Sequence, residues 1–538
     1  MKQAYKFCLA VTLGCFISLN AQQQSFDDEA PFDFFEELAQ SDPLLDENYT
    51  QQSFSEKITP EIALKYLTHH RDCPPDAGPD ALINAGAILE QDLYLRTNPP
   101  NDRAILDYPA FYFPYCIPQN WQFTGQLWFN ITPRVALFND EFMLRDYLAF
   151  ENKNLIAQLD ALAFDINIPK ILSLLGDTEV EERRAALMGW FARRRGNWYI
   201  QWKTPIAYVE RNFNLDEQEQ AQISQELTAL VGDTFDFETF KKEHLISDKL
   251  GLGDSRMTAG YTFVEQPLLW LNAGFLATIP TAFAFTKGIF GSHFPKNSTN
   301  PPFDLLEILN LVVAGEIKQV QEIGVTFLLG ALDKLSANLL DSEIGNGGHF
   351  GLGFFMDKRL YVTPRFSFDT HAEFEYLLPA MEKRFYINRK NPAEFARLLN
   401  PDLLECEEDI AFIQQQLIET LFPRVFDTLI FPGVLLKFST GGHILISPKT
   451  DLIIGYDLWW QQQERLGRII ATGNEEALAR REIATKPAAI QNKLFMTATY
   501  EHNGDNGDWC ISINVDKTFL STGIGSDVSA SFRVEYLF

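Results

Sequence analysis

Few residues of this chain are arranged in a pattern that supports catalysis. His69 and His70 are the only adjacent pair among eight histidines, and we expect them on a surface helix rather than on a metal ion. The run Gly253-Asp254-Ser255 has the small residues of a hydrolase's serine turn, but it lies at the edge of an expected strand. The sequence contains no phosphate loop, dinucleotide-binding glycine pattern, paired-cysteine metal site or zinc-binding histidine pair. We therefore predict no catalytic residue, no metal site and no cofactor.

A second set of polar residues has a regular spacing that suits a pore. Charged residues recur opposite apolar ones in stretches where the two kinds alternate, so both signs of charge project from one face. Such a face could line a lumen and select small polar solutes. The competing interpretation is that these charges pair with one another and fill a solid interior. The candidate pore-lining residues are Arg256, Arg365, Asp369, Lys437, Asp457, Lys493, Arg533 and Glu535.

The elements that would position these residues are long amphipathic strands. From 434 to 446 the even positions are mainly apolar, and after a polar turn at 447–451 the alternation continues from Leu452 to Trp460. Several such stretches reach ten residues or more, which exceeds the usual strand of a soluble sandwich and is enough to cross a bilayer. We count eleven strands, with residues 104–116 as a weaker twelfth.

Composition narrows the class of protein. The chain has 538 residues and a net charge of −27, which argues against a nucleic-acid partner. It is 46% hydrophobic and 22% charged, too apolar for disorder, yet its mean hydropathy of −0.12 is too low for a polytopic helical membrane protein. The run 268–285 could form a transmembrane helix, but Gly274 and Pro280 favour strands there.

The N-terminus indicates export. Residues 1–21 have the layout of a secretory signal peptide, with two lysines before an apolar stretch and Ala21 before the expected cleavage. Lipidation at Cys15 is the less favoured alternative. Residues 22–100 are expected to form an acidic periplasmic segment, since 22–56 contains no Lys or Arg. The pairing of the remaining cysteines is not assignable from sequence; these are Cys73, Cys116, Cys406 and Cys510.

The last strand carries the most specific signal in the chain. In residues 528–538 every second side chain is apolar, and the chain ends on an aromatic residue. This strand resembles the C-terminal signal of Gram-negative outer-membrane β-barrel proteins. The resemblance implies location in an outer membrane and recognition by the barrel assembly machinery through Phe532, Val534, Tyr536 and Phe538. The Gly251-Leu-Gly253-Asp254 run also looks like that of barrels that transport hydrophobic substrates.

The lengths of the connections support this resemblance, because such barrels keep short turns on the periplasmic side and long loops outside. If Phe538 is periplasmic, the predicted periplasmic turns are all short and lie at 502–507, 447–451, 357–358 and 265–267. The connections on the other side are long and cover 461–491, 374–433, 286–346 and 210–255. One connection fails this test: residues 136–196 are long where a short turn is expected, so either a strand near 186–193 or a helical insert lies there.

These observations predict an all-β membrane barrel of about twelve antiparallel transmembrane strands within 101–538, with fourteen as the alternative. Helical insertions are expected near 137–196, 302–342, 376–430 and 461–490. The predicted function is a passive outer-membrane channel or transporter, whose partners are outer-membrane lipid and small-molecule solutes. A surface adhesin or receptor anchored by the barrel is the alternative, and an outer-membrane hydrolase comes third. The sequence predicts no oligomeric state.

Overall fold

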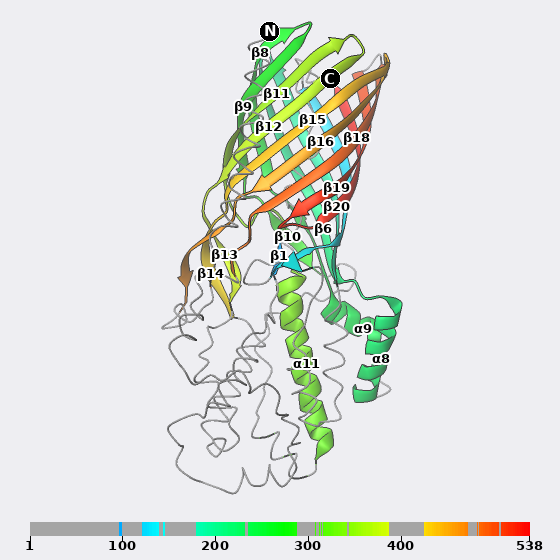
Figure 1. Ribbon diagram of the computed structural model, residues 1–538, viewed down its shortest axis with the longest axis vertical. Helices are drawn as coiled ribbons and strands as arrows, with labels where there is room; N and C mark the ends of the chain where they lie inside the picture. Colours follow the sequence, from blue (N-terminus) through cyan, green and yellow to red (C-terminus); the bar gives the residue numbers. More distant parts are fainter. Residues whose placement is uncertain are drawn as a thin grey trace, which may run out of the picture. The chain divides into compact units, whose positions relative to one another are not determined.

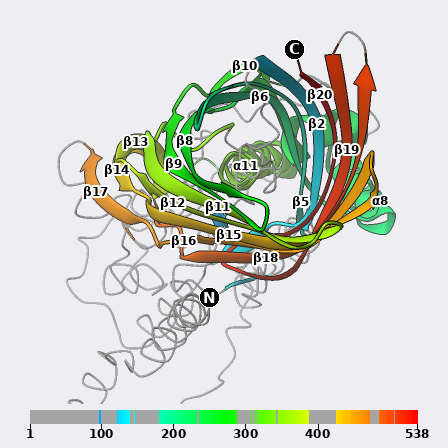
Figure 2. The same cartoon turned by 90° about the horizontal axis from the view of Figure 1, so that it is seen from above.

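The computed structural model describes residues 96–98, 121–138, 144–145, 179–231, 235–287, 316–341, 344–386, 424–471, 484–504 and 507–537, together with residues 307, 311, 314 and 481. Within these ranges the main feature is a closed barrel of antiparallel strands (Figure 1). The ring closes where the first barrel strand pairs with the last, as the view along the barrel shows (Figure 2).

The barrel is built from fourteen strand segments of the 14-stranded sheet. They are β2 (Trp121–Arg134), β5 (Val180–Arg195), β6 (Trp198–Phe213), β7 (Ile246–Leu252), β8 (Ser255–Gln266), β9 (Leu269–Ile279), β10 (Phe283–Lys287), β11 (Gly351–Thr363), β12 (Phe366–Leu377), β15 (Gly433–Ser447), β16 (Thr450–Gln461), β18 (Ala489–Gly504), β19 (Gly507–Thr522) and β20 (Ser526–Leu537).

Two of the crossings consist of two consecutive segments each. The first half of β6 pairs with β8 and its second half with β7, so β7 and β8 make one crossing. In the same way β9 pairs with β8, and β10 pairs with β7. The break between β7 and β8 lies opposite Pro205, which has no N–H to donate, and Gly253 N instead donates to Pro205 O at 2.8 Å. The segments therefore make the predicted twelve crossings, and the alternative of fourteen is wrong.

Side chains of the barrel alternate between an outer and an inner face. In β2 the even-numbered residues are buried and the odd-numbered ones are mostly exposed, and the other strands follow the same rule. The exposed face is apolar and includes Phe123, Leu127, Phe129, Leu187, Phe191, Ile206, Phe263, Phe275, Leu352, Phe354, Phe368, Ile454, Leu494, Met496, Ile513 and Phe532. A closed barrel with such a surface has no unpaired strand edge to place in lipid, so the predicted membrane-barrel fold is confirmed.

Aromatic side chains gather where strands meet the short turns. Trp198 contacts Tyr261 with ring centroids 4.9 Å apart, and Trp509 contacts Tyr536 at 4.6 Å. The guanidinium of Arg193 lies 4.9 Å from the centre of the Trp121 ring. Indole and phenol rings are amphipathic and are enriched at the membrane–water interface. This end of the barrel therefore has the chemistry of an interfacial belt.

The connections differ sharply between the two ends of the barrel. At one end the described connections are short turns, located at 196–197, 267–268, 364–365 and 448–449, and only two residues separate β18 from β19. At the other end the connections are long, except for residues 523–525 between β19 and β20. The predicted alternation of short and long connections is confirmed.

The strand that the sequence left open near 186–193 exists as β5. It pairs along its length with β2 and β6, so residues 180–195 are not part of the helical insertion predicted near 137–196. Its alternation was hard to see because Ala186, Met188 and Trp190 are apolar on the inner face while Leu187 is apolar on the outer face. Residues 104–116 lie outside the described residues.

The turn predicted at 357–358 is wrong. β11 continues through both residues, and the turn falls at Pro364-Arg365. Asp357 points to the inner face and is 5% exposed, so its polarity reflects the interior of the barrel rather than a turn. The run 268–285 forms β9 and β10 rather than a helix.

Helices occupy part of the long connections. The predicted insertion near 302–342 contains α11 (Ile317–Leu339), whereas α8 (Glu217–Val231), α9 (Phe237–Phe240) and the π-helical turn η2 (Lys241–Leu245) were not predicted. Asp216 caps α8, since its Oδ1 accepts from the N–H of Glu219 at 2.7 Å and Glu219 Oε2 accepts from the N–H of Asp216 at 2.7 Å. None of the helices in the described part of the chain is long and apolar enough to span a membrane.

Two small sheets occupy other connections. The strands β13 (Ala380–Tyr386), β14 (Arg424–Phe431) and β17 (Arg465–Ile470) pair in one sheet. The described parts of the predicted helical insertions near 376–430 and 461–490 are thus mainly strands, which are rich in the aromatic and β-branched residues that favour this conformation. The second sheet contains β1 (Arg96–Asn98), β3 (Ala136–Phe138) and β4 (Leu144–Arg145). Because β3 follows the end of β2, β1 lies at the end with the long connections.

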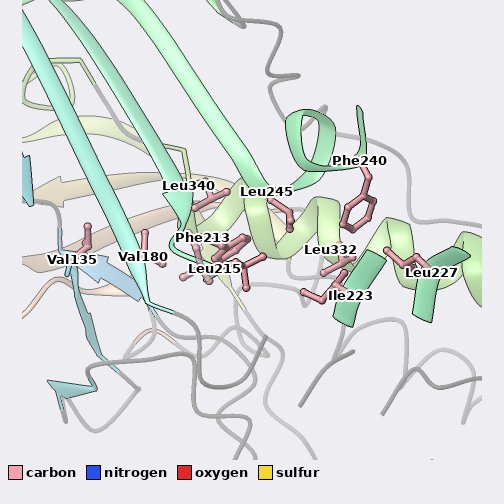
Figure 3. Packing of buried hydrophobic residues seen from close by; sticks show 11 residues of the cluster. Val135, Val180, Phe213, Leu215, Ile223, Leu227, Phe240, Leu245, Leu332 and Leu340 are labelled. Atoms are coloured by element: carbon pink, nitrogen blue, oxygen red, sulfur yellow. The ribbon is translucent and has the colours of Figure 1, made fainter. Parts of the chain in front are cut away.

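An apolar core fixes the helices to the strand ends (Figure 3). Leu332 and Leu339 of α11 belong to it, and Ile223 and Leu227 contribute from α8. The remaining members come from α9, η2 and the ends of the barrel strands and their connections; they are Val135, Val180, Phe213, Leu215, Phe240, Leu245 and Leu340. The C-terminal end of α11 is therefore held at the rim of the barrel.

Candidate functional site: the barrel lumen and its mouth

Seven of the eight candidate pore-lining residues lie on the inner faces of barrel strands. Six of them are less than 10% exposed, and Asp457 is partly buried. Arg365 is the exception, because it lies in the turn between β11 and β12 and is exposed. The structure therefore moves Arg365 from the lumen to the end of the barrel with the short turns.

One group of charges joins β8, β11 and β12. Arg256 Nη2 lies 2.9 Å from Glu375 Oε2 and 3.1 Å from Glu373 Oε1. His371 stands beside Glu373, with its Nε2 at 3.4 Å, and its Nδ1 lies 2.6 Å from Asp357 Oδ1. Every charged group here has a partner of opposite charge, which offsets the cost of removing it from water.

Two further ion pairs lie along the inner wall. Arg359 and Asp369 form a bidentate pair, with Nε–Oδ1 and Nη2–Oδ2 both at 2.6 Å. Lys493 Nζ lies 2.7 Å from Asp527 Oδ2 and 3.2 Å from Asp516 Oδ1. The first pair links β11 to β12, and Lys493 links β18 to β19 and to β20 beyond it, so the charges connect the strands of the barrel wall from inside.

The remaining candidates contact neighbouring strands. Arg533 Nε lies 2.8 Å from Glu535 Oε1, and Gln122 Nε2 donates to Glu535 Oε2 at 3.1 Å. Ser439 donates to Asp457, which is also the register partner of Lys493. Lys437 is the register partner of Glu373. The candidate set is thus one part of a larger polar lining.

Part of the lumen wall is apolar. On β2, β5 and β6 the buried inward residues include Trp128, Ala186, Met188, Trp190 and Ala207. Buried asparagine and glutamine side chains lie next to this patch at neighbouring inward positions. Arg184 and Glu182 lie between the patch and the mouth of the barrel, which is the end with the long connections. A solute that crosses the lumen would meet apolar and charged wall on different sides.

A loop from the connection before β11 enters the mouth. Arg211 Nη1 donates to the carbonyl of Leu339 at 3.1 Å, which holds the end of α11 near the outer end of the β5–β6 ladder. Further along the chain, Ile344 packs against Trp128, Ala186 and Ala207 on the inner wall. Ala207 lies four residues further into the barrel than Arg211 along β6. We call residues 344–349 the mouth loop. Its N-terminal part lies inside the barrel.

Asp254, at the break between β7 and β8, anchors the mouth loop. Its Oδ2 accepts from the backbone N–H of Asn346 at 2.7 Å, and its Oδ1 accepts from Ala282 N at 3.2 Å, at the break between β9 and β10. Gly345 has φ +93°, and a Cβ there would lie 2.4 Å from the Cβ of Ala282. Only glycine fits this close approach without strain.

The other end of the mouth loop is held by β13. His349 Nε2 lies 2.5 Å from Glu382 Oε1, and His349 Nδ1 lies 2.8 Å from the carbonyl oxygen of Leu378. Glu382 also pairs with Arg384 at 2.6 Å. Burial alone would raise the pKa of the Glu382 carboxyl, but Arg384, the hydrogen bond from His349 and the charge of Lys486 lower it to about 2. Glu382 is therefore a carboxylate at neutral pH.

Several residues of this lining were missed by sequence reasoning. His371, Glu373 and Glu375 continue the inward parity of Asp369, but the predicted strand ended before them, and Glu375 fell in the connection predicted at 374–433. Arg359 was missed because a turn was placed just before it. Extending the period-two pattern to strands of 12 or 13 residues would have found all of them.

Some predictions fall where the structure gives no description. Cys73, Cys116 and Cys406 lie outside the described residues, as do His69 and His70. Cys510 is a free cysteine on the inner face of β19. Among the described residues, no cluster of three or more His, Cys, Asp or Glu side chains is arranged to hold a metal ion.

No protein-family model matches the chain, and no curated protein matches it. Among solved structures, it is similar to the COG4313 outer membrane channel from Pseudomonas putida F1, with 9% identity and a TM-score of 0.38 over 79% of this chain and 97% of that one. The Ralstonia pickettii toluene transporter TbuX has 10% identity and a TM-score of 0.32 over 87% and 96%. The translocator domain of the autotransporter NalP from Neisseria meningitidis has 8% identity and a TM-score of 0.31 over 79% and 90%. Similarities this weak identify no substrate.

Proposed function

We propose that this protein is an outer-membrane channel or transporter for small polar solutes. The observation that carries the proposal is the contrast between the two faces of the closed barrel. The outer face is apolar, whereas the inner face holds charges of both signs on β8, β12, β15, β18 and β20. A wall of fixed, opposed charges produces a transverse field that acts on dipolar or charged solutes in a narrow path.

The lumen in this conformation is closed. Most inward side chains of the described strands are less than 10% exposed, and the mouth loop reaches into the barrel. Transport therefore requires movement of the mouth loop or of the paired charges. The paired charges can move between distinct arrangements, because a charged side chain can exchange one partner of opposite charge for another.

Single-channel conductance of the refolded protein in a planar bilayer tests this function. Lys437 is 7% exposed on the inner wall, so Lys437→Glu is expected to shift ion selectivity towards cations. Arg365→Glu makes the same charge change in an exposed turn and is the matched control, which we expect to have little effect. A membrane-inserted protein that passes no current under any condition would refute the channel.

A surface adhesin or receptor is the second candidate. All but one of the connections at one end of the barrel are long, and they carry helices and two small sheets. Such surfaces suit binding to an external partner. Binding of the purified protein to host or bacterial surfaces, with an electrically silent barrel, would favour this candidate over the channel.

The route to the membrane is part of the proposal. Residues 1–21 would direct export, residues 22–100 would form a largely periplasmic segment, and the last strand would engage the barrel assembly machinery. In β20 the side chain of Phe532 is exposed on the lipid-facing side, and Val534 and Tyr536 follow at the same parity. Phe538 lies outside the described residues. Proteolytic removal of the leader and fractionation with outer-membrane lipid would support this route.

A further inference from the structure

The mouth loop is a separable element between two fixed supports. On its N-terminal side, α11 is held by the apolar core and by the hydrogen bond from Arg211. On its C-terminal side, β11 begins at Gly351 and pairs with both neighbours. The loop itself is tied by Ile344 in the lumen, by Asp254 and by Glu382. It can therefore leave the lumen without unfolding α11 or any barrel strand.

The glycines of the loop lower the conformational energy needed for such a movement. They also allow the close contacts that define the closed position. Gly347 and Gly348 have φ angles of +73° and +87°, which suit glycine. A Cβ on Gly347 would lie 2.2 Å from Glu382 Oε1, so the backbone lies directly against the carboxylate. The loop fits against β13 closely in one position and has backbone freedom to adopt others.

The contacts of His349 require its charged form. A carbonyl oxygen only accepts hydrogen bonds, so Nδ1 must donate to Leu378 O. Glu382 is a carboxylate, so Nε2 must donate to it as well. A neutral imidazole has a single N–H and loses one of these two bonds. The side chain is 1% exposed, so water does not replace the lost partner in the closed position.

The groups around His349 allow it to leave. Arg384 of β13 remains paired with Glu382, so the carboxylate keeps a counter-ion when the imidazole moves away. Arg384 is also 3.1 Å from Glu464, which lies 3.9 Å from Lys486. On the barrel side the facing charge is Asp254, which binds the loop through the N–H of Asn346. Departure of His349 therefore opens this contact without leaving a buried carboxylate unpaired.

We propose that the mouth loop is the gate of the lumen and that the His349–Glu382 contact is its latch, which opens when the imidazole leaves the Glu382 carboxylate. The inference rests on the proposed channel function and adds its regulation.

The test records single channels of the full-length protein at neutral pH. Glu382→Gln keeps the size of the side chain and removes the charge. We expect it to raise the open probability about tenfold, because it breaks a buried charge-assisted hydrogen bond. Lys383→Gln removes a charge from the exposed face of the same strand and should behave as the parent protein.

A second measurement follows the loop itself. Ile344→Cys, in a chain whose own cysteines are replaced by serine, should react with a membrane-impermeant maleimide faster in the Glu382→Gln background than in the parent background. A heat-modifiable band on gels shows that each variant has a folded barrel. Asp254→Asn, which weakens the other anchor, should also speed the reaction if the barrel is folded.

The two measurements separate the failure of the gate from the failure of the channel. Currents that flow with equal open probability in Glu382→Gln and Lys383→Gln, with unchanged labelling, would overturn the gate and leave the channel intact. Labelling that responds as expected while no current flows would support the moving loop and overturn the channel function.

Discussion

Replacing Asp369 with asparagine would test whether water reaches the inner wall of the barrel around this residue. Arg359 and Asp369 face each other across β11 and β12, and their side chains are 4% and 0% exposed. Asparagine has the same shape, so Asp369→Asn leaves no cavity but strands the guanidinium without its counter-ion. His443 Nδ1, 3.9 Å from the same carboxylate, loses a favourable neighbour too. Breaking a buried pair from one side costs about 3–5 kcal/mol, and we expect a loss in this range.

The assay is reversible urea unfolding in phospholipid vesicles, followed by tryptophan fluorescence. Arg365→Gln is the control, because this exposed turn residue lies only a few positions away and should change the free energy of unfolding by less than about 0.5 kcal/mol. The double variant Arg359→Met/Asp369→Leu removes both charges and is expected to recover most of the stability lost in the single variant.

A small effect would refute this reasoning. If Asp369→Asn costs less than about 1 kcal/mol, the pair behaves as an exposed salt bridge, and water must reach this part of the wall. The closed lumen inferred from burial would then be wrong for this region, even if the barrel itself is correct.

Three other predictions concern selectivity, pH and assembly. Lys493→Gln leaves two carboxylates without their cation, and the ratio of K⁺ to Cl⁻ permeability should rise; an unchanged ratio would remove this residue from the path. The pKa of Glu382 is lowered in the folded protein, so its stabilisation is present above the ordinary value of 4.5 and is lost as the pH falls towards about 2. A spin label at Met381→Cys, on the exposed face of β13, should therefore gain mobility over that interval, and constant mobility would contradict the role of Glu382. Deleting Phe538 should slow membrane assembly in cells without changing the conductance of refolded protein, and normal assembly would rule out this signal.

The strands of the barrel were largely predictable because membrane and lumen impose opposite chemistry on alternate residues. This contrast is strong in β16, where Asp451 and Asp457 alternate with Leu452 and Ile454. It is weak in β5, where the inner wall is itself apolar and the period-two pattern disappears. Sequence analysis therefore left β5 unassigned because its inner face is apolar, and not because the strand is short.

The polar networks were less predictable than the strands. The sequence identified Arg256 and Asp369 as inward residues, but their partners depend on register. A register shift of one residue would reverse the faces of an entire strand, and only the pairing of β11 with β12 brings Arg359 opposite Asp369. The local sequence shows which side chains point inward. Which of them form ion pairs is set only by the register of the assembled sheet.

The mouth loop had no signal that sequence reasoning used. Its glycines and His349 read as an ordinary polar connection. Their role comes from Asp254 and Glu382, which are about 90 positions upstream and about 30 positions downstream in the chain and meet the loop only through the barrel topology. The Asp216–Glu219 capping box, by contrast, is a local pattern that sequence reading could have used to predict α8.

The closure of the ring by β2 and β20 has a consequence for the order of folding. Gln122 and Glu535, which meet across this seam, are 413 positions apart in the chain. Contacts between such distant residues form slowly, because the ends must find each other before any pairing energy is gained. Until then β2 and β20 are two open edges with lipid-facing Phe123 and Phe532 beside them, and open apolar edges aggregate. The seam is therefore the last part of the barrel to form and the part most in need of protection while the chain is incomplete.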